Sequence, residues 1–201
     1  MVSEFKKKKF LHIYYAFFDT DRSGSIDKKD FELAIEKIAK LRGYNQGEIA
    51  YDVLKEILFQ IWDGLQKQAD TDGDGEISVD EWISLWEAYS KNPDAASDWQ
   101  KLYCKFIFQL EDARRDGAID EDEFASVYES FGLDKGESIE AFKKIAKGKD
   151  KVTWEDFQSL WKEYFTTEDP KDAGNYIFGC YICSLTPHSH DHSGHGHSHS
   201  H

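Results

Sequence analysis

Apolar residues recur along most of the chain at the three- and four-residue spacing of an amphipathic helix, and acidic segments interrupt these runs. The runs predict helices on both sides of each interruption. The predicted helices lie near residues 4–18, 31–43, 49–65, 82–91, 99–110, 124–131, 142–145 and 157–165. The pattern therefore predicts an all-α protein built from repeated helix–loop–helix units.

The clearest interruption is the segment 70–81. A calcium ion takes about six to eight oxygen ligands, and a twelve-residue loop can gather them. Gly75 at loop position 6 permits the sharp turn, and Ile77 at position 8 can pair with another loop as a short β-ribbon. The expected ligands are Asp70, Asp72, Asp74, Glu76 through its carbonyl, Ser78 and Glu81. An acidic surface turn is the alternative, but every diagnostic position of the calcium-loop motif agrees.

A second loop of this kind spans residues 19–30. Its expected ligands are Asp19, Asp21, Ser23, Ser25 through its carbonyl, Asp27 and Asp30. Asp30 stands at position 12, where glutamate is usual, and its side chain is one methylene shorter. It reaches the metal with both oxygens only if the loop contracts. Because a smaller six-coordinate site tolerates Mg²⁺, the sequence predicts a mixed Ca²⁺ and Mg²⁺ site here.

The segment 112–123 has the same spacing but carries Arg114 at position 3. Arginine cannot coordinate a metal, and its charge opposes an incoming cation unless it pairs with Asp112 or Asp116. The remaining candidate ligands are Asp112, Asp116, Ala118, Asp120 and Glu123. Weak binding is the alternative if Arg114 swings outward, but the sequence favours an impaired third site.

A fourth unit is visible mainly in its helices. When Val152 is placed at position 8, the loop spans residues 145–156, with Ile145, Lys147 and Lys149 at positions 1, 3 and 5. None of these three is a calcium ligand. We expect this loop to bind nothing and to pair with the third one.

A proline-containing segment near Pro93 predicts a boundary between a first pair of units, residues 1–92, and a second pair, residues 97–165. In the segment 166–185, apolar residues 176–178 are expected to enter a hydrophobic cleft. The histidine-rich residues 186–201 are expected to be disordered and to bind transition metals in vitro. Cys180 and Cys183 have the spacing of a zinc or redox pair, but free thiols are the favoured interpretation.

The composition favours a folded protein that binds cations and argues against a nucleic-acid-binding protein. The 201-residue chain has a formal net charge of −14 and 15% aromatic residues, so it can bury a core while favouring cations over nucleic acid. A secretory signal and a membrane span are missing from the sequence, and the cysteine count is odd; we therefore expect a cytoplasmic monomer. The lysine run 6–9 is expected to be a solvated face rather than a lipid contact. His12 is the only histidine outside the tail, and a phosphate-binding loop is absent, so we do not expect an enzyme.

The segments 31–35 (FELAI) and 61–65 (IWDGL), the silent fourth unit and aspartate at position 12 of the first loop resemble invertebrate sarcoplasmic calcium-binding proteins. Within that group the chain is most similar to calexcitins, over roughly residues 5–179. The resemblance implies a compact helical protein with a folded C-terminal segment, and calexcitins imply a neuronal signalling role.

The sequence leaves the choice between buffer and sensor open. Sensors use flexible methionines to fit varied targets, whereas the only methionine here is Met1. The many aromatic residues favour one fixed packing, and thus a Ca²⁺ and Mg²⁺ buffer or a sensor with few targets. The alternative is a calexcitin-like sensor that acts on a membrane or protein target, with a tail that binds transition metal.

Overall fold

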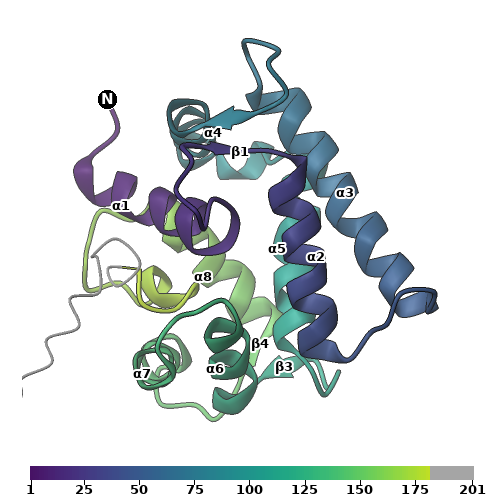
Figure 1. The fold of residues 1–201 in the computed structure, drawn as a ribbon. Helices are drawn as coiled ribbons and strands as arrows, with labels where there is room; N and C mark the ends of the chain where they lie inside the picture. The colour runs from purple at the N-terminus through teal and green to yellow at the C-terminus, as the bar shows by residue number, and fades with distance from the viewer. Residues whose placement is uncertain (182–201) are drawn as a thin grey trace, which may run out of the picture.

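In the computed structural model, residues 1–181 are described, and they form eight α-helices and two two-stranded antiparallel sheets (Figure 1). The helices are α1 (Glu4–Ile13), α2 (Lys28–Arg42), α3 (Ile49–Ala69), α4 (Val79–Lys91), α5 (Asp98–Glu111), α6 (Glu121–Ser130), α7 (Lys135–Ala146) and α8 (Trp154–Thr166). Three short helical segments accompany them, η1 (Tyr14–Phe18), η2 (Pro93–Ala95) and η3 (Ala173–Tyr176). The predicted all-α fold is confirmed.

The four loops pair through short strands. β1 (Ser25–Ile26) pairs with β2 (Ile77–Ser78), and β3 (Ala118–Ile119) pairs with β4 (Val152–Thr153). In each ribbon two position-8 residues face each other, Ile26 with Ile77 and Ile119 with Val152. All four are buried. The predicted ribbons between paired loops are therefore confirmed, and the two ribbons lie at opposite ends of the molecule (Figure 1).

The helix that leaves each loop begins with a reciprocal capping box. The side chain at position 9 accepts a hydrogen bond from the backbone at position 12, and the side chain at position 12 accepts one from the backbone at position 9. The pairs are Asp27 with Asp30, Ser78 with Glu81, Asp120 with Glu123, and Thr153 with Asp156. Such a cap contributes about 1 kcal/mol to helix stability, so these positions fix where each exit helix starts even without a ligand.

Aromatic side chains from both ends of the chain form one core. Trp86 of α4 stacks on Phe165 of α8, with ring centroids 4.3 Å apart, and Phe165 also contacts Phe10 of α1. Trp82 donates a hydrogen bond from its ring nitrogen to the carbonyl of Phe10 (2.8 Å). Offset and edge contacts of this kind add to the free energy of burial. Helices α1, α4 and α8 therefore pack against one another.

The first helix differs from its prediction. The apolar spacing predicts one continuous helix over residues 4–18, but α1 ends at Ile13 and the turn from Tyr14 to Phe18 is π-helical. This wider turn places Tyr14 so that its hydroxyl donates a hydrogen bond to the carbonyl of Ile77 (2.8 Å), beneath the first ribbon. This hydrogen bond connects the π-helical turn with the second loop, 63 residues further along the chain.

Lys9 is fully buried, so the expectation that the run 6–9 is a solvated face is wrong at this position. Its ammonium donates hydrogen bonds to the carbonyl of Thr167 and to Asn175 Oδ1, both at 3.0 Å. It also lies 4.6 Å from the centroid of the Phe5 ring. Two oxygen acceptors and an aromatic face replace part of the lost hydration. Burial nevertheless lowers the pKa of Lys9 to about 8.

The C-terminal segment packs against α1, α6 and α8. Ile177 and Phe178 are buried, and Tyr128 of α6 donates a hydrogen bond to the carbonyl of Ile177 (3.1 Å). The ring nitrogen Nε2 of His12 lies 2.8 Å from the carbonyl oxygen of Phe178, and burial lowers the pKa of this imidazole to about 4. Buried polar contacts from two helices therefore fix this segment.

The structure describes residues 1–181, so the predicted disorder and metal binding of residues 186–201 lie outside it, as does Cys183 of the Cys180 and Cys183 pair. Cys180 is disulfide-bonded, which differs from the free thiol that the sequence favours. Cys104 is a free, buried thiol. The helices formed by residues 1–181 are all too short or too polar to span a lipid bilayer.

Candidate metal centre

The loop 70–81 gathers its carboxylates around one point. Asp70 follows α3 directly, and its two oxygens accept hydrogen bonds from the backbone N–H groups of Gly73 (3.0 Å) and Gly75 (2.9 Å). Both glycines have positive φ angles, +72° and +79°, which a side chain would make costly. The turn that these glycines allow folds the loop back over Asp70.

Glu81 closes the same loop from the first turn of α4. Its Oε1 accepts a hydrogen bond from the backbone of Ser78 (2.9 Å), and its Oε2 accepts one from the backbone of Thr71 (2.7 Å). The glutamate side chain therefore spans the loop from its end to its second position. Ligand oxygens of Asp70, Asp72, Asp74 and Glu81 all lie within 4.8 Å of one another.

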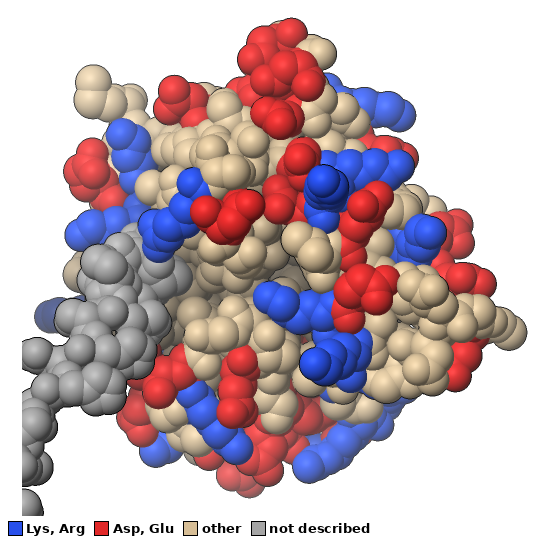
Figure 2. All heavy atoms as spheres, viewed as in Figure 1, with Lys and Arg blue, Asp and Glu red and all other residues tan. Residues whose placement is uncertain are grey.

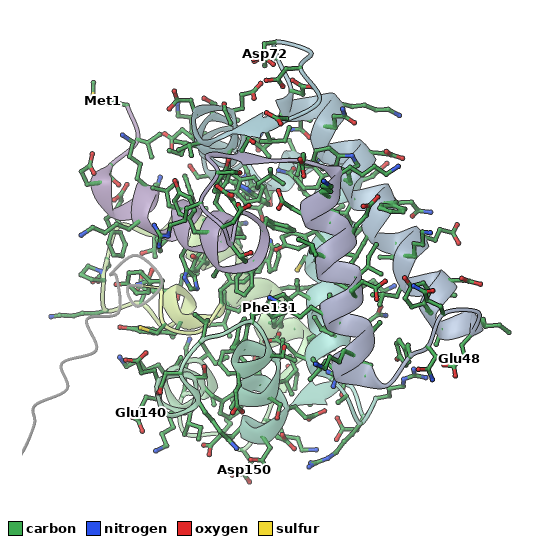
Figure 3. All side chains as sticks on the ribbon, viewed as in Figure 1. Met1, Glu48, Asp72, Phe131, Glu140 and Asp150 are labelled. Atoms are coloured by element: carbon green, nitrogen blue, oxygen red, sulfur yellow. The ribbon has the colours of Figure 1, made fainter. Side chains whose placement is uncertain are left out.

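This arrangement fits a hard divalent cation. Oxygen ligands at about 2.3–2.6 Å from a calcium ion necessarily lie within about 5 Å of one another. Asp72 lies at the tip of a loop that projects from the molecule (Figure 3), and acidic side chains gather at the same place on the surface (Figure 2). Several negative charges held together in this way attract a cation and repel each other when it is absent. The second loop therefore has the donors and the spacing of a calcium site.

The first loop is arranged differently. Asp19 is fully buried and accepts hydrogen bonds from the backbone of Ser23 (2.9 Å) and Gly24 (2.8 Å). Asp30 accepts from the backbone of Asp27 (3.0 Å) within its capping box. Among residues 1–181, carboxylate oxygens from three or more side chains come within 4.8 Å of one another in the second and third loops. The carboxylates of the first loop do not gather in this way.

The shorter side chain of Asp30 explains this difference. Glu81 reaches across its loop to the backbone of Thr71, and Glu123 reaches the backbone of Arg114 (2.9 Å) in the same way. Asp30 instead remains in its capping box with Asp27. Burial, followed by the nearby carboxylates Asp27 and Asp19, raises the pKa of Asp30 to about 6. A metal at this loop would have to draw Asp30 inwards.

The third loop brings Asp112, Asp116 and Glu123 together within 4.8 Å. Arg114 forms an ion pair with Asp120 rather than with Asp112 or Asp116, the two partners that the sequence suggests as an alternative. Asp116 pairs instead with Lys151 of the fourth loop, whose hydrogen bond is the main cause of a lowered pKa at this carboxyl.

Sequence reasoning missed Lys151. The signal that could have found it is the ribbon register, because pairing of Ile119 with Val152 places the residue before Val152 next to the third loop.

In the fourth loop, a lysine side chain contacts the carboxylate at position 12. The ammonium of Lys149, at position 5, lies 2.8 Å from Asp156 Oδ2, at position 12. Helix α7 continues to Ala146, and Lys147 adopts a left-handed conformation with φ of +52°. Positive φ angles fall at positions 3 and 4 of this loop, Lys147 and Gly148, whereas in the other three loops they fall at positions 4 and 6, as at Gly73 and Gly75. The turn geometry of the fourth loop therefore differs from that of the others.

Comparison with known proteins agrees with this geometry. The sequence profile of the EF hand family matches residues 16–33 and 67–86, which contain the first and second loops. With the acidic cluster and the paired helix–loop–helix units, this match defines the class: the chain is a calcium-binding EF-hand protein.

Two relatives define the family more closely. Calexcitin-1 of Caenorhabditis elegans is 32% identical over 185 residues, which covers 89% of this chain and 88% of that protein. Sarcoplasmic calcium-binding proteins I, III and IV of Branchiostoma lanceolatum are 26% identical over 184 residues, or 89% of this chain and 98% of theirs. The chain belongs to the EF-hand family that contains calexcitin and the sarcoplasmic calcium-binding proteins.

The solved structure of a sarcoplasmic calcium-binding protein from amphioxus has the same fold. It superposes with a TM-score of 0.73 at 24% identity, covering 89% of this chain and 98% of that one. The Branchiostoma relatives and the amphioxus protein are both named as sarcoplasmic calcium-binding proteins.

Proposed function

We propose that this protein is a cytoplasmic calcium buffer that binds Ca²⁺ at the first and second loops. The observation that carries the proposal is the gathering of Asp70, Asp72, Asp74 and Glu81 within 4.8 Å. The expected ligands of the first loop extend from Asp19 to Asp30, and those of the second extend from Asp70 to Glu81. The third loop contributes weakly in this proposal, and the fourth does not contribute.

We further propose that Mg²⁺ competes with Ca²⁺ at the first loop. Mg²⁺ demands about six ligands at shorter distances, whereas Ca²⁺ accepts the seventh oxygen that a bidentate glutamate supplies. The contact that Asp30 makes with Asp27 (3.0 Å), rather than across the loop, supports monodentate ligation at this position. At the free Mg²⁺ concentration of a cell, such a site would exchange one ion for the other.

The core supports a buffer rather than an adaptable sensor. A sensor opens on Ca²⁺ binding and exposes a groove, whereas a buffer changes little. Here stacked and edge-on rings, such as Trp86 on Phe165, fill the centre, and the chain has a single methionine at its start. Rigid aromatic packing is expensive to rearrange.

One observation favours the alternative, a sensor for a protein or membrane target. Residues 173–181 pack on side chains of α7 and α8 and also contact Phe5 of α1 and Tyr128 of α6, so a calcium-driven release of this segment would expose apolar surface. The relation to calexcitin-1 makes this alternative worth testing.

Fluorescence of an apolar dye tests the choice. The full chain is measured free of metal, with Mg²⁺ and with Ca²⁺. Equal, low fluorescence with either ion supports the buffer. A large increase specific to Ca²⁺ would contradict the buffer and support the sensor.

A further inference from the structure

Lys151 belongs to the fourth loop but contacts the third. It comes directly before β4, whose Val152 pairs with Ile119 of β3. The antiparallel register therefore carries the lysine alongside the third loop, where its ammonium donates a hydrogen bond to Asp116 Oδ2. The side chains of Lys151 and Asp116 are 45% and 37% exposed, so the pair lies at the surface, where solvent can enter.

A second basic side chain acts on the same loop. The guanidinium of Arg114 pairs with the carboxylate of Asp120, while the backbone N–H of Arg114 donates to Glu123 Oε2 (2.9 Å). Asp116 and Asp120 are at loop positions 5 and 9, and each forms an ion pair with a different basic side chain. In Figure 2, lysine and arginine side chains lie among acidic ones at the end of the molecule where Figure 1 places β3, β4 and α7.

The second loop provides the contrast. Its carboxylates accept hydrogen bonds from backbone N–H groups, such as that of Gly75 to Asp70 (2.9 Å) and that of Thr71 to Glu81 (2.7 Å). A backbone N–H carries no net charge and can remain in place when a metal binds. An ammonium on a ligand oxygen repels the metal and has to leave first.

We propose that Lys151 is a specificity-determining residue of the third loop, a resident cation that competes with Ca²⁺ for Asp116. Arg114 has the same effect at Asp120. The fourth loop, which lacks ligands at positions 1, 3 and 5, thereby sets the calcium affinity of its partner. This inference rests on the proposed calcium binding through EF-hand loops.

The charges give the expected size of the effect. A single positive charge about 5 Å from a divalent cation weakens binding about tenfold in a water-like dielectric, and salt screens part of this. Removal of Lys151 should therefore strengthen Ca²⁺ binding at the third loop about tenfold at low ionic strength. Because Lys151 and Arg114 pair with different carboxylates, the double variant should bind Ca²⁺ more tightly than either single variant.

Equilibrium dialysis of Ca²⁺ against the full chain tests this inference. The variants are Lys151→Gln, Arg114→Gln, the double variant and Lys151→Arg, which keeps the charge. Lys162→Gln is the matched control, because Lys162 forms a similar surface pair with Asp94 (3.2 Å). The measurement is made at low and at high salt, and circular dichroism checks that each variant is folded.

The expected result is a third calcium equivalent that tightens about tenfold in Lys151→Gln and further in the double variant, most strongly at low salt. Lys151→Arg and Lys162→Gln should behave like the wild type. The inference is overturned if Lys151→Gln leaves the third equivalent unchanged, or if Lys151→Arg changes it as much as Lys151→Gln does. The number of Ca²⁺ ions that the wild type binds at the first two loops tests the proposed function separately. The inference concerns only how the Ca²⁺ affinity of the third loop differs between the variants and the wild type.

Discussion

The buried ammonium of Lys9 makes stability depend on pH in a direction that can be calculated. Burial lowers its pKa from 10.5 to about 8, so between these values the unfolded chain binds more protons than the folded one. Stability that depends on Lys9 must therefore rise with pH in this interval. From pH 7 to pH 9.5 the two pKa values give an increase of about 2 kcal/mol in the free energy of unfolding.

Cys104 opposes this trend, because burial raises the pKa of its thiol from 9.0 to about 12. The folded state then holds a proton that the unfolded state loses above about pH 9, which lowers stability by about 1 kcal/mol at pH 9.5. The contribution of Lys9 is isolated by comparing the wild type with Lys9→Met, which keeps the length of the side chain and removes the charge.

Urea unfolding at pH 7 and pH 9.5, at one fixed free Ca²⁺ concentration, is the assay. The increase in the free energy of unfolding between the two values should be about 2 kcal/mol larger in the wild type than in Lys9→Met. Lys8→Met is the control, because Lys8 is exposed, and it should follow the wild type. The reasoning is refuted if Lys9→Met shows the same pH dependence as the wild type.

Three further predictions concern the loops and the C-terminal segment. Asp30→Glu should raise the preference of the first loop for Ca²⁺ over Mg²⁺, because glutamate can supply two oxygens; an unchanged ratio in competition titrations would contradict the geometry. Arg114→Asp should strengthen calcium binding at the third loop by adding a ligand at position 3, and identical calorimetric titrations of variant and wild type would show that Arg114 is not limiting. Phe178→Ala should lower the free energy of unfolding by about 3–5 kcal/mol, because the ring is buried among Phe17, Trp161 and Tyr164; a loss below about 1 kcal/mol in urea unfolding would count against its place in the core.

The elements and their pairing could be predicted because they follow from local patterns. Apolar spacing gives the helices, and position 8 of each loop gives the ribbon partner, as the pairs Ile26 with Ile77 and Ile119 with Val152 show. The capping boxes follow from the same short spacing between positions 9 and 12. Each of these signals lies within one repeat of the sequence.

Features that depend on distant residues could not be predicted. The burial of Lys9 needs acceptors from Thr167 and Asn175, which no local pattern connects with the first helix. The π-helical turn at Tyr14 is stabilised by a contact with Ile77, and the pairing of Lys151 with Asp116 needs the ribbon register. The consequences of Asp30 could be predicted in part, because the length of a side chain limits its reach in any loop.

Calcium binding by the wild type, Glu81→Gln and Glu76→Gln, measured by equilibrium dialysis, tests the central claim most directly. Glu81 spans the second loop with both carboxylate oxygens, whereas Glu76 is expected to contribute only its backbone carbonyl. The account predicts that Glu81→Gln loses one calcium equivalent and that Glu76→Gln keeps it. Undiminished binding by Glu81→Gln, or the same loss in both variants, would contradict the account.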